Sequence, residues 1–356
     1  MIVILSLDIG GANTKYALLK KERGEERLIT HGSIYFPFWQ KNKEYPKLLR
    51  QIRTTIETNF GEITKVVFVT TAELADCFTT KKEGIKAISD YMLEVFADKE
   101  PEILDFAGKF IPAENATDCW EQVAATNWYA SAMFLGSRYS NAILLDIGST
   151  TTDIIPIHNR KVVAQGRTDL ERLATSELVY TGLLRTNVIA ILSQVKIDEK
   201  ITRLSSELFA TTADVYLLLD KISPKEFFVE TADGKPFTKE HAKARLARVV
   251  CADTNQLTEE EILGIARQVQ TEQYKIIRDA LEKVRKRYQK NFRCEPTIVL
   301  IGAGATTIGL PILNQLKIKN GLIAKEELAE EALNCFSAYA LGMLAIQINT
   351  PKEMGK

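Results

Sequence analysis

Two stretches of this chain repeat one short pattern, and the repeat limits the possible folds more than any other feature does. The first stretch, LSLDIGGANTKYALL, covers residues 5–19, and the second, LLDIGSTTTDIIPI, covers residues 144–157. In each stretch an apolar run ends in Asp-Ile-Gly and turns at once into small hydroxylated or amide residues, before a second apolar run begins. This is the pattern of a strand, a tight turn and a second strand, and its duplication predicts two lobes of similar topology.

The rest of the chain alternates strand and helix patterns. Helical periodicity covers 44–59 and 81–96, and a buried strand is expected between them at 65–70. A long helix is expected over about 258–290, where Thr258-Glu-Glu-Glu has capping-box spacing, and a strand follows it. This alternation predicts an α/β fold with mixed sheets flanked by helices.

The lobes can be given approximate limits. The first lobe is expected over residues 1–140, and a C-terminal helix at about 325–350, rich in small residues, is expected to complete it. The second lobe is expected over residues 141–324. Within it, residues from about 193 to 257 are richer in charge and weaker in periodicity, which predicts an inserted subdomain.

Composition excludes several classes of protein. Lys and Arg number 46 and so do Asp and Glu, so no net charge attracts nucleic acid or an acidic membrane. No apolar run approaches the roughly 18 residues that a membrane span requires, and no basic region marks a signal peptide. The scattered cysteines lack any C-x-x-C pair and are predicted to be reduced core residues of a cytoplasmic protein.

The first turn, DIGGANTK, has the composition of an anion-binding loop. Gly10 and Gly11 carry no Cβ, so consecutive backbone N–H groups can approach phosphate oxygens. Asp8, at the end of a buried strand, offers oxygen ligands for a hydrated magnesium ion beside that phosphate. Further donors are the side chains of Asn13, Thr14 and Lys15.

The second turn, DIGSTTTD, repeats this chemistry, with Asp146 as a second magnesium ligand. Facing each other across a cleft between the lobes, the two turns would form a clamp for a polyphosphate and its metal. The alternative for a single turn is an ordinary tight turn that its Asp caps, with threonines placed there as strand formers. The predicted phosphate ligands of this turn are Gly148, Ser149, Thr150, Thr151 and Thr152.

A third glycine turn follows a buried strand in IVLIGAGATTIG, residues 298–309. A dinucleotide fingerprint is the obvious rival, but the third glycine comes too late after the second and no acidic residue follows at the right distance. We expect Gly302 and Gly304 instead to let a nucleotide or another flat ligand approach the backbone.

Other polar residues give weaker signals. Thr70, Thr71 and Glu73 follow a buried strand, where α/β proteins place ligand loops, although a helix N-cap explains them as well. Asp153 is the first candidate for a general base, with Asp214 and Glu73 behind it, because no histidine lies in any motif. The alternative for Asp153 is a supporting role that holds the threonine turn.

Taken in order, the three turns resemble those of the actin, sugar-kinase and Hsp70 superfamily, and DIGSTTTD resembles the motif of its hydantoinase and oxoprolinase branch. More narrowly, several further stretches resemble one small family of tetrahydromethanopterin-linked C1-pathway proteins. These stretches are GGANTKYA, IYFPFW at 34–39, TTAELAD at 70–76, NWYASA at 127–132, TDLERLATSELVYTGLLRTNV at 168–188 and LFATTADVYLLL at 208–219.

The resemblance implies a transferase of methanofuran biosynthesis within a two-lobed actin-like fold. Its substrates would be 5-(aminomethyl)-3-furanmethanol diphosphate and γ-glutamyltyramine, and pyrophosphate would be released. The resemblance also implies magnesium and small-molecule partners, and it allows a homo-oligomer. The alternatives are an ATP- and magnesium-dependent kinase or amidohydrolase, in which the same turns bind ATP, and a nucleotide-sensing protein without catalysis.

Overall fold

The structure, a computed structural model, describes residues 1–226, 230–324, 333 and 335–349. The chain divides into two compact units. The first unit contains Met1–Asn141, Ile157–Asp169 and the described residues after 326, and the second contains Ala142–Pro156 and Leu170 onwards to 326. Residues 157–169, which the sequence placed in the second lobe, therefore group with the first unit.

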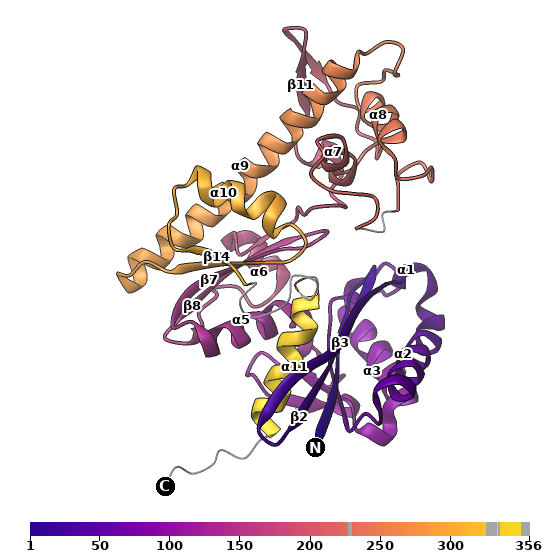
Figure 1. The fold of residues 1–356 in the computed structure, drawn as a ribbon, viewed down its shortest axis with the longest axis vertical. Coiled ribbons are helices and arrows are strands. Elements are labelled where there is room, and N and C mark those ends of the chain that lie inside the picture. Colours follow the sequence, from indigo (N-terminus) through magenta and orange to yellow (C-terminus); the bar gives the residue numbers. More distant parts are fainter. Residues whose placement is uncertain (227–229, 325–332, 334, 350–356) are drawn as a thin grey trace. The chain divides into compact units, whose positions relative to one another are not determined.

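The first unit is built on a six-stranded sheet (Figure 1). Its strand β1 (Ile2–Ile9) pairs antiparallel with β2 (Asn13–Glu22) and parallel with β4 (Lys65–Thr70). The carboxyl ends of β1 and β4 therefore lie at the same edge. The full order is β3-β2-β1-β4-β5-β6, in which β3 is Glu25–Tyr35, β5 is Glu102–Leu104 and β6 is Phe110–Pro112.

Helices α2 (Tyr45–Phe60) and α3 (Lys81–Phe96) confirm the helices predicted at 44–59 and 81–96. Alternate side chains of β1, from Val3 to Ile9, pack with these helices in one apolar core, as the period of two in a strand requires. The side chain of Thr80 caps α3 by accepting a hydrogen bond from the Glu83 N–H. The unit also contains α1 (Phe38–Lys41), α4 (Trp120–Val123) and α5 (Asn127–Arg138).

The C-terminal helix α11 (Phe336–Asn349) packs on β1, β2 and β4, as predicted for the end of the chain. The Ser6 hydroxyl of β1 donates to the Ala338 carbonyl at 2.6 Å. A Cβ at Gly342 would lie 2.2 Å from a Leu19 methyl carbon, so the small residue permits the close approach. The first part of the helix predicted from 325 lies outside the described residues.

The second sheet repeats the arrangement of the first around β7 (Asn141–Ile147). Its following strand, β8 (Thr152–His158), lies on one side, and the parallel strand β13 (Thr297–Ile301) lies on the other. This is the relation of β1 to β2 and β4, so the sequence repeat corresponds to a repeat in topology. The sheet also contains β9 (Lys161–Val162), β10 (Leu178–Val179) and β14 (Gly321–Ile323).

Helix α9 (Glu259–Phe292) is the longest element of the second unit, with 34 residues. Thr258 and Glu261 form the predicted capping box at its start. Figure 1 shows α9 running from the sheet to the elements of the predicted insert, and the contacts agree. Those elements are β11 (Gln194–Ile197), β12 (Lys200–Arg203), α7 (Thr212–Leu218) and α8 (Lys239–Arg248); α6 (Asp169–Thr175) and α10 (Leu310–Gln315) lie outside the insert.

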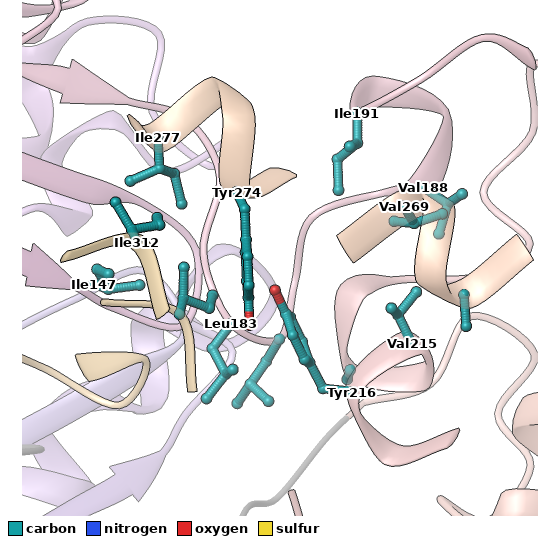
Figure 2. Packing of buried hydrophobic residues seen from close by; sticks show 14 of the residues in the cluster. Ile147, Leu183, Val188, Ile191, Val215, Tyr216, Val269, Tyr274, Ile277 and Ile312 are labelled. Atoms are coloured by element: carbon teal, nitrogen blue, oxygen red, sulfur yellow. The ribbon is translucent and has the colours of Figure 1, made fainter. Parts of the chain in front are cut away.

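The insert shares its apolar core with the sheet. Val215 and Tyr216 of α7 belong to the same buried cluster as Ile147 of β7 and Val269 of α9 (Figure 2). The predicted class, α/β with mixed sheets and flanking helices, is confirmed. In the described part of the chain, no helix combines the length and apolarity needed to cross a membrane.

The five cysteines are free, and the prediction that they are core residues holds in part, because Cys77, Cys119 and Cys294 are partly buried against the apolar cores. Only Cys335 is buried, and Cys251 is exposed. The isolated positions of these residues in the sequence carried no information on their side-chain packing, which depends on the elements around them.

Two helical glycines provide a test of this packing. A Cβ at Gly84 of α3 would lie 2.3 Å from the Glu73 carbonyl oxygen, whereas a Cβ at Gly264 of α9 would meet no atom within 4 Å. We expect Gly84→Ala to lower the free energy of unfolding by about 1–3 kcal/mol through overpacking. Gly264→Ala should raise it by about 0.5–1 kcal/mol through helix propensity. Urea denaturation measures both, and equal effects would contradict the close approach of α3 to residue 73.

Candidate phosphate-binding loops

Loop 1, residues 10–13, joins β1 to β2. The Gly10 N–H closes the turn by donating to the Asn13 carbonyl at 2.9 Å. The two carbonyls in between also point into the protein, since Ala12 accepts from the Phe36 N–H and Gly11 from the Phe38 N–H, both at 2.9 Å. Every carbonyl from residue 11 to 13 is thus occupied by a donor of the chain itself.

Loop 2, residues 148–151, joins β7 to β8 and has the same construction. The Gly148 N–H donates to the Thr151 carbonyl at 2.9 Å. The Gly148 carbonyl accepts from the Leu183 N–H at 2.9 Å, and the Ser149 carbonyl accepts from the N–H groups of residues 184 and 185 at 2.9 and 3.0 Å. A separate segment again supplies the donors.

Both loops share a geometry that suits the binding of an anion, because among the described residues N–H groups are left without partners while carbonyl oxygens are engaged. Carbonyl oxygens would repel an anion, and here the carbonyls of residues 11–13, 148, 149 and 151 accept hydrogen bonds from the chain itself. In the described part of the chain, no hydrogen bond is donated by the N–H groups of Gly11, Ala12, Ser149 or Thr150. Consecutive N–H groups of this kind form an anion-binding concavity. The prediction differs in one detail, because the N–H groups of Gly10 and Gly148 close the turns.

Three threonines of the predicted site serve the framework instead. The Thr14 hydroxyl lies 2.9 Å from the Tyr45 hydroxyl, and the Thr152 hydroxyl donates to the Thr181 carbonyl at 2.8 Å. The Thr70 hydroxyl donates to the Ile9 carbonyl at 3.0 Å. All three are buried strand residues, whose side chains point into a packed face of the sheet.

Asp8 has the environment of a cation ligand. It is 3% exposed, its Oδ2 accepts from the Ser337 hydroxyl, and the Lys15 Nζ lies 3.9 Å away. Its buried Oδ1 has no hydrogen-bond partner among the described residues. Such an oxygen normally requires a partner, and a bound cation supplies one. No cluster of three or more His, Cys, Asp or Glu in the described residues could hold a metal, but magnesium commonly uses one or two carboxylates with phosphate and water.

Loop 3, residues 302–304, supports Asp146 of β7. Gly302 has a φ of +84°, and a Cβ there would lie 2.4 Å from Asp146 Oδ1 and 2.5 Å from the Ile147 carbonyl oxygen. The Gly304 N–H donates to that carbonyl at 2.8 Å. The space that these glycines leave is therefore taken by the end of β7, whereas the sequence predicted a ligand there. Parallel pairing of β13 with β7 brings the two loops together.

Asp153 and Asp214, both candidates for a proton acceptor, form ion pairs inside the second unit. Asp153 pairs with the buried Arg172, a contact that fits the alternative role of holding the turn. Asp214 Oδ1 accepts from the Arg245 Nε and Nη2 at 2.9 and 2.7 Å, and its Oδ2 accepts from the Thr211 N–H. Asp214 Oδ1 thus ties α7 to α8, and Oδ2 caps the start of α7 itself.

Glu73 lies in the short 3-10 helix Ala72–Leu74 that follows β4. The neighbouring Thr71 N–H donates to the Ile9 carbonyl at 2.9 Å, at the end of β1. Glu73 is 1% exposed, with the Lys81 Nζ 3.9 Å from its Oε1 and no hydrogen-bond partner for Oε2 among the described residues. Burial raises the pKa of Glu73 from 4.5 to about 7, against the opposing charge of Lys81.

Sequence reasoning missed the segment that holds loop 2, residues 181–186, which we call the strap. A Cβ at Gly182 would lie 2.6 Å from the Gly148 carbonyl oxygen and 2.7 Å from the Thr150 nitrogen. Only glycine allows this approach of two backbones. The signal was a glycine between threonines in YTGLLRT, but no local pattern shows which loop it contacts.

Comparisons with known proteins find one family model and two named relatives. Residues 65–344 match the model of the hydantoinase/oxoprolinase family. A Methanocaldococcus jannaschii protein named (4-{4-[2-(gamma-L-glutamylamino)ethyl]phenoxymethyl}furan-2-yl)methanamine synthase is 38% identical over 304 residues, which are 85% of this chain and 86% of that protein. A Methanococcus vannielii protein of the same name is 45% identical over 151 residues, 42% of this chain and 66% of that protein.

Among solved structures, the nucleotide-free structure of acetone carboxylase has a TM-score of 0.58 to this chain. It covers 96% of this chain and 70% of the other, at 10% sequence identity. At this identity the likeness concerns the fold alone.

The raised pKa of Glu73 makes stability depend on pH. Between about pH 4.5 and 7 the folded protein holds a proton that the unfolded chain has released, so stability falls as pH rises through this window. Glu73→Gln removes this titration. We therefore expect the difference in unfolding free energy, variant minus wild type, to increase by about 2–3 kcal/mol between pH 5 and pH 8.

Guanidinium denaturation at the two pH values gives the difference. Glu121→Gln changes an exposed carboxylate of the same unit and serves as the control. An identical pH dependence of the two variants would contradict the raised pKa.

Proposed function

This chain belongs to the hydantoinase/oxoprolinase family, and we propose that it is a transferase that forms the phenoxymethyl-furan ether in methanofuran biosynthesis. Its fold is that of the actin-like ATPase superfamily. The proposed substrates are 5-(aminomethyl)-3-furanmethanol diphosphate and γ-glutamyltyramine, and the second product is pyrophosphate. The name of the Methanocaldococcus relative supports this proposal, because it describes a molecule in which such an ether joins the two parts.

The observation that carries the proposal is the polarity of loops 1 and 2. In the reaction, the phenol oxygen forms a bond to the furan methylene carbon, and the bond from that carbon to the diphosphate oxygen breaks. The electron pair leaves on pyrophosphate, and the phenolic proton passes to a base. Fixed N–H groups aimed at the phosphate oxygens stabilise the charge that develops there. Lys15, whose side chain is about one-third exposed, adds a positive charge at loop 1.

Magnesium is the cation that we propose for the carboxylates at the two strand ends. Asp8, with its unpaired Oδ1, and Asp146 would hold the ion. When bound, it would neutralise charge on the departing pyrophosphate. The apposition of Asp8 and Asp146 across a cleft stays a prediction, as do a homo-oligomer and a cytoplasmic location.

Three carboxylates are candidates for the proton acceptor, and their surroundings differ. Asp153 stays the predicted base, and its pairing with Arg172 holds it at the start of β8, next to loop 2. Asp214 is engaged within the insert. Glu73 has a pKa of about 7, the range in which a general base works best at neutral pH, and it is the second candidate.

A turnover assay tests the proposal. The purified protein is incubated with magnesium, the furan diphosphate and γ-glutamyltyramine, and pyrophosphate and ether are measured with and without ATP. We expect one pyrophosphate per ether and no requirement for ATP. Turnover that consumes ATP would favour a kinase or amidohydrolase instead, and ligand binding without any turnover would favour a sensing protein.

The carboxylates at the strand ends provide a second test. We expect Asp8→Asn and Asp146→Asn each to lower kcat at least about 100-fold, because an amide is a poor magnesium ligand and carries no charge. Circular dichroism and thermal unfolding should show an intact fold.

Asp90→Asn, an exposed position on α3, is the matched control and should keep the wild-type rate. Wild-type rates in both strand-end variants would remove the proposed metal ligands.

A further inference from the structure

Two neighbouring polar residues on α9 contact segments next to loops 2 and 3: Gln273 contacts the strap, and Tyr274 contacts the residues that follow loop 3. Gln273 is fully buried, and its Nε2 donates to the Thr181 hydroxyl at 2.9 Å and to the Gly182 carbonyl at 2.8 Å. Both acceptors lie in the strap. The Tyr274 hydroxyl donates to the Thr307 carbonyl at 2.5 Å, in the short π-helix Ala305–Gly309 that follows loop 3.

The orientation of the Gln273 amide is fixed by a third contact. The Tyr216 hydroxyl of α7 lies 2.7 Å from Gln273 Oε1. An amide oxygen only accepts, so the hydroxyl must donate, and the NH₂ group is left to face the strap. Figure 2 shows Tyr216, Tyr274 and the strap residue Leu183 within one packed cluster. Both amide hydrogens and the amide oxygen of Gln273 are therefore satisfied.

The strap connects Gln273 with loop 2 through a series of hydrogen bonds. The Gly182 carbonyl also accepts from the Thr212 hydroxyl at 3.1 Å, and the Gly182 N–H donates to the Thr186 hydroxyl at 3.0 Å. Gly182 is thus held on both sides, and its lack of a Cβ allows the backbone of loop 2 to lie close to it. The N–H groups of the next three strap residues, 183–185, donate to the carbonyls of Gly148 and Ser149 in loop 2.

We propose that Gln273 is a positioning residue for anion binding: through the strap, it keeps the carbonyls of loop 2 turned inward and its N–H groups directed at pyrophosphate. The inference rests on the proposed function, in which loop 2 holds this product. If Gln273 only filled space in the core, its side-chain volume would matter and its hydrogen-bond donors would not. Replacing the amide by an apolar group of similar length separates these roles.

Gln273→Met retains the length of the side chain and removes both donors. Isothermal titration with magnesium pyrophosphate should show a dissociation constant raised about tenfold, since the two lost hydrogen bonds leave the Gly182 and Thr181 acceptors under-satisfied. Amide hydrogen exchange should accelerate at Leu183 and Leu184, whose N–H groups bind the loop carbonyls. Tyr216→Phe removes only the contact to the amide oxygen and should give a smaller change of the same sign.

Tyr288→Phe is the control, because it removes a buried hydroxyl from another turn of the same helix. It should leave both the pyrophosphate affinity and the exchange of the strap amides unchanged.

Wild-type affinity and exchange in Gln273→Met would overturn the proposal, and so would equal losses in Gln273→Met and Tyr288→Phe. If the wild type itself binds no pyrophosphate, the proposed function fails, and the exchange rates of Leu183 and Leu184 still decide whether Gln273 positions the strap. If Gln273→Met does not fold, Tyr216→Phe provides the same comparison.

Discussion

The candidate sites depend on one kind of interaction, the hydrogen bonds that turn the carbonyl oxygens of loops 1 and 2 into the protein. At loop 1 the donors come from residues 36 and 38, and at loop 2 they come from the strap. Without these donors the short loops would present carbonyls and N–H groups alike, and an anion would meet both. With them, the N–H groups at each tip define an electropositive surface at no cost in net charge, which is zero for the chain.

The carboxylates are arranged by the same architecture. Parallel pairing places the ends of β1 and β4 at one edge of the first sheet and the ends of β7 and β13 at one edge of the second. Asp8 and Asp146 stand at these edges, each beside its loop. Their supports differ: Asp8 is held by Ser337 of α11, a residue from the far end of the chain, whereas Asp146 is packed against loop 3. The repeat thus preserves the position of the carboxylate and varies its surroundings.

The second unit contains, besides the repeated sheet, an inserted subdomain and the long helix α9. Both are linked to loop 2 through the strap. Helix α9 crosses from the sheet to α7 and α8, and the buried Gln273 joins α7 to the strap. Because protein interiors are close-packed, a shift of α7 would displace the strap and with it loop 2. The insert is in this sense part of the support of the anion site, although its own ion pair between Asp214 and Arg245 is structural.

The sequence by itself determined the α/β class, the repeated strand-turn-strand units, the helices at 44–59 and 81–96 and the capping box of α9, because periodicity and capping are local. It also singled out Asp8, Asp146 and the two glycine turns. Only the tertiary structure decided that Thr14, Thr70 and Thr152 hold the framework, and that Gly302 and Gly304 make room for β7. The strap and Gln273 likewise became visible only there, since hydrogen bonds between residues some 90 positions apart leave no periodic trace in a sequence.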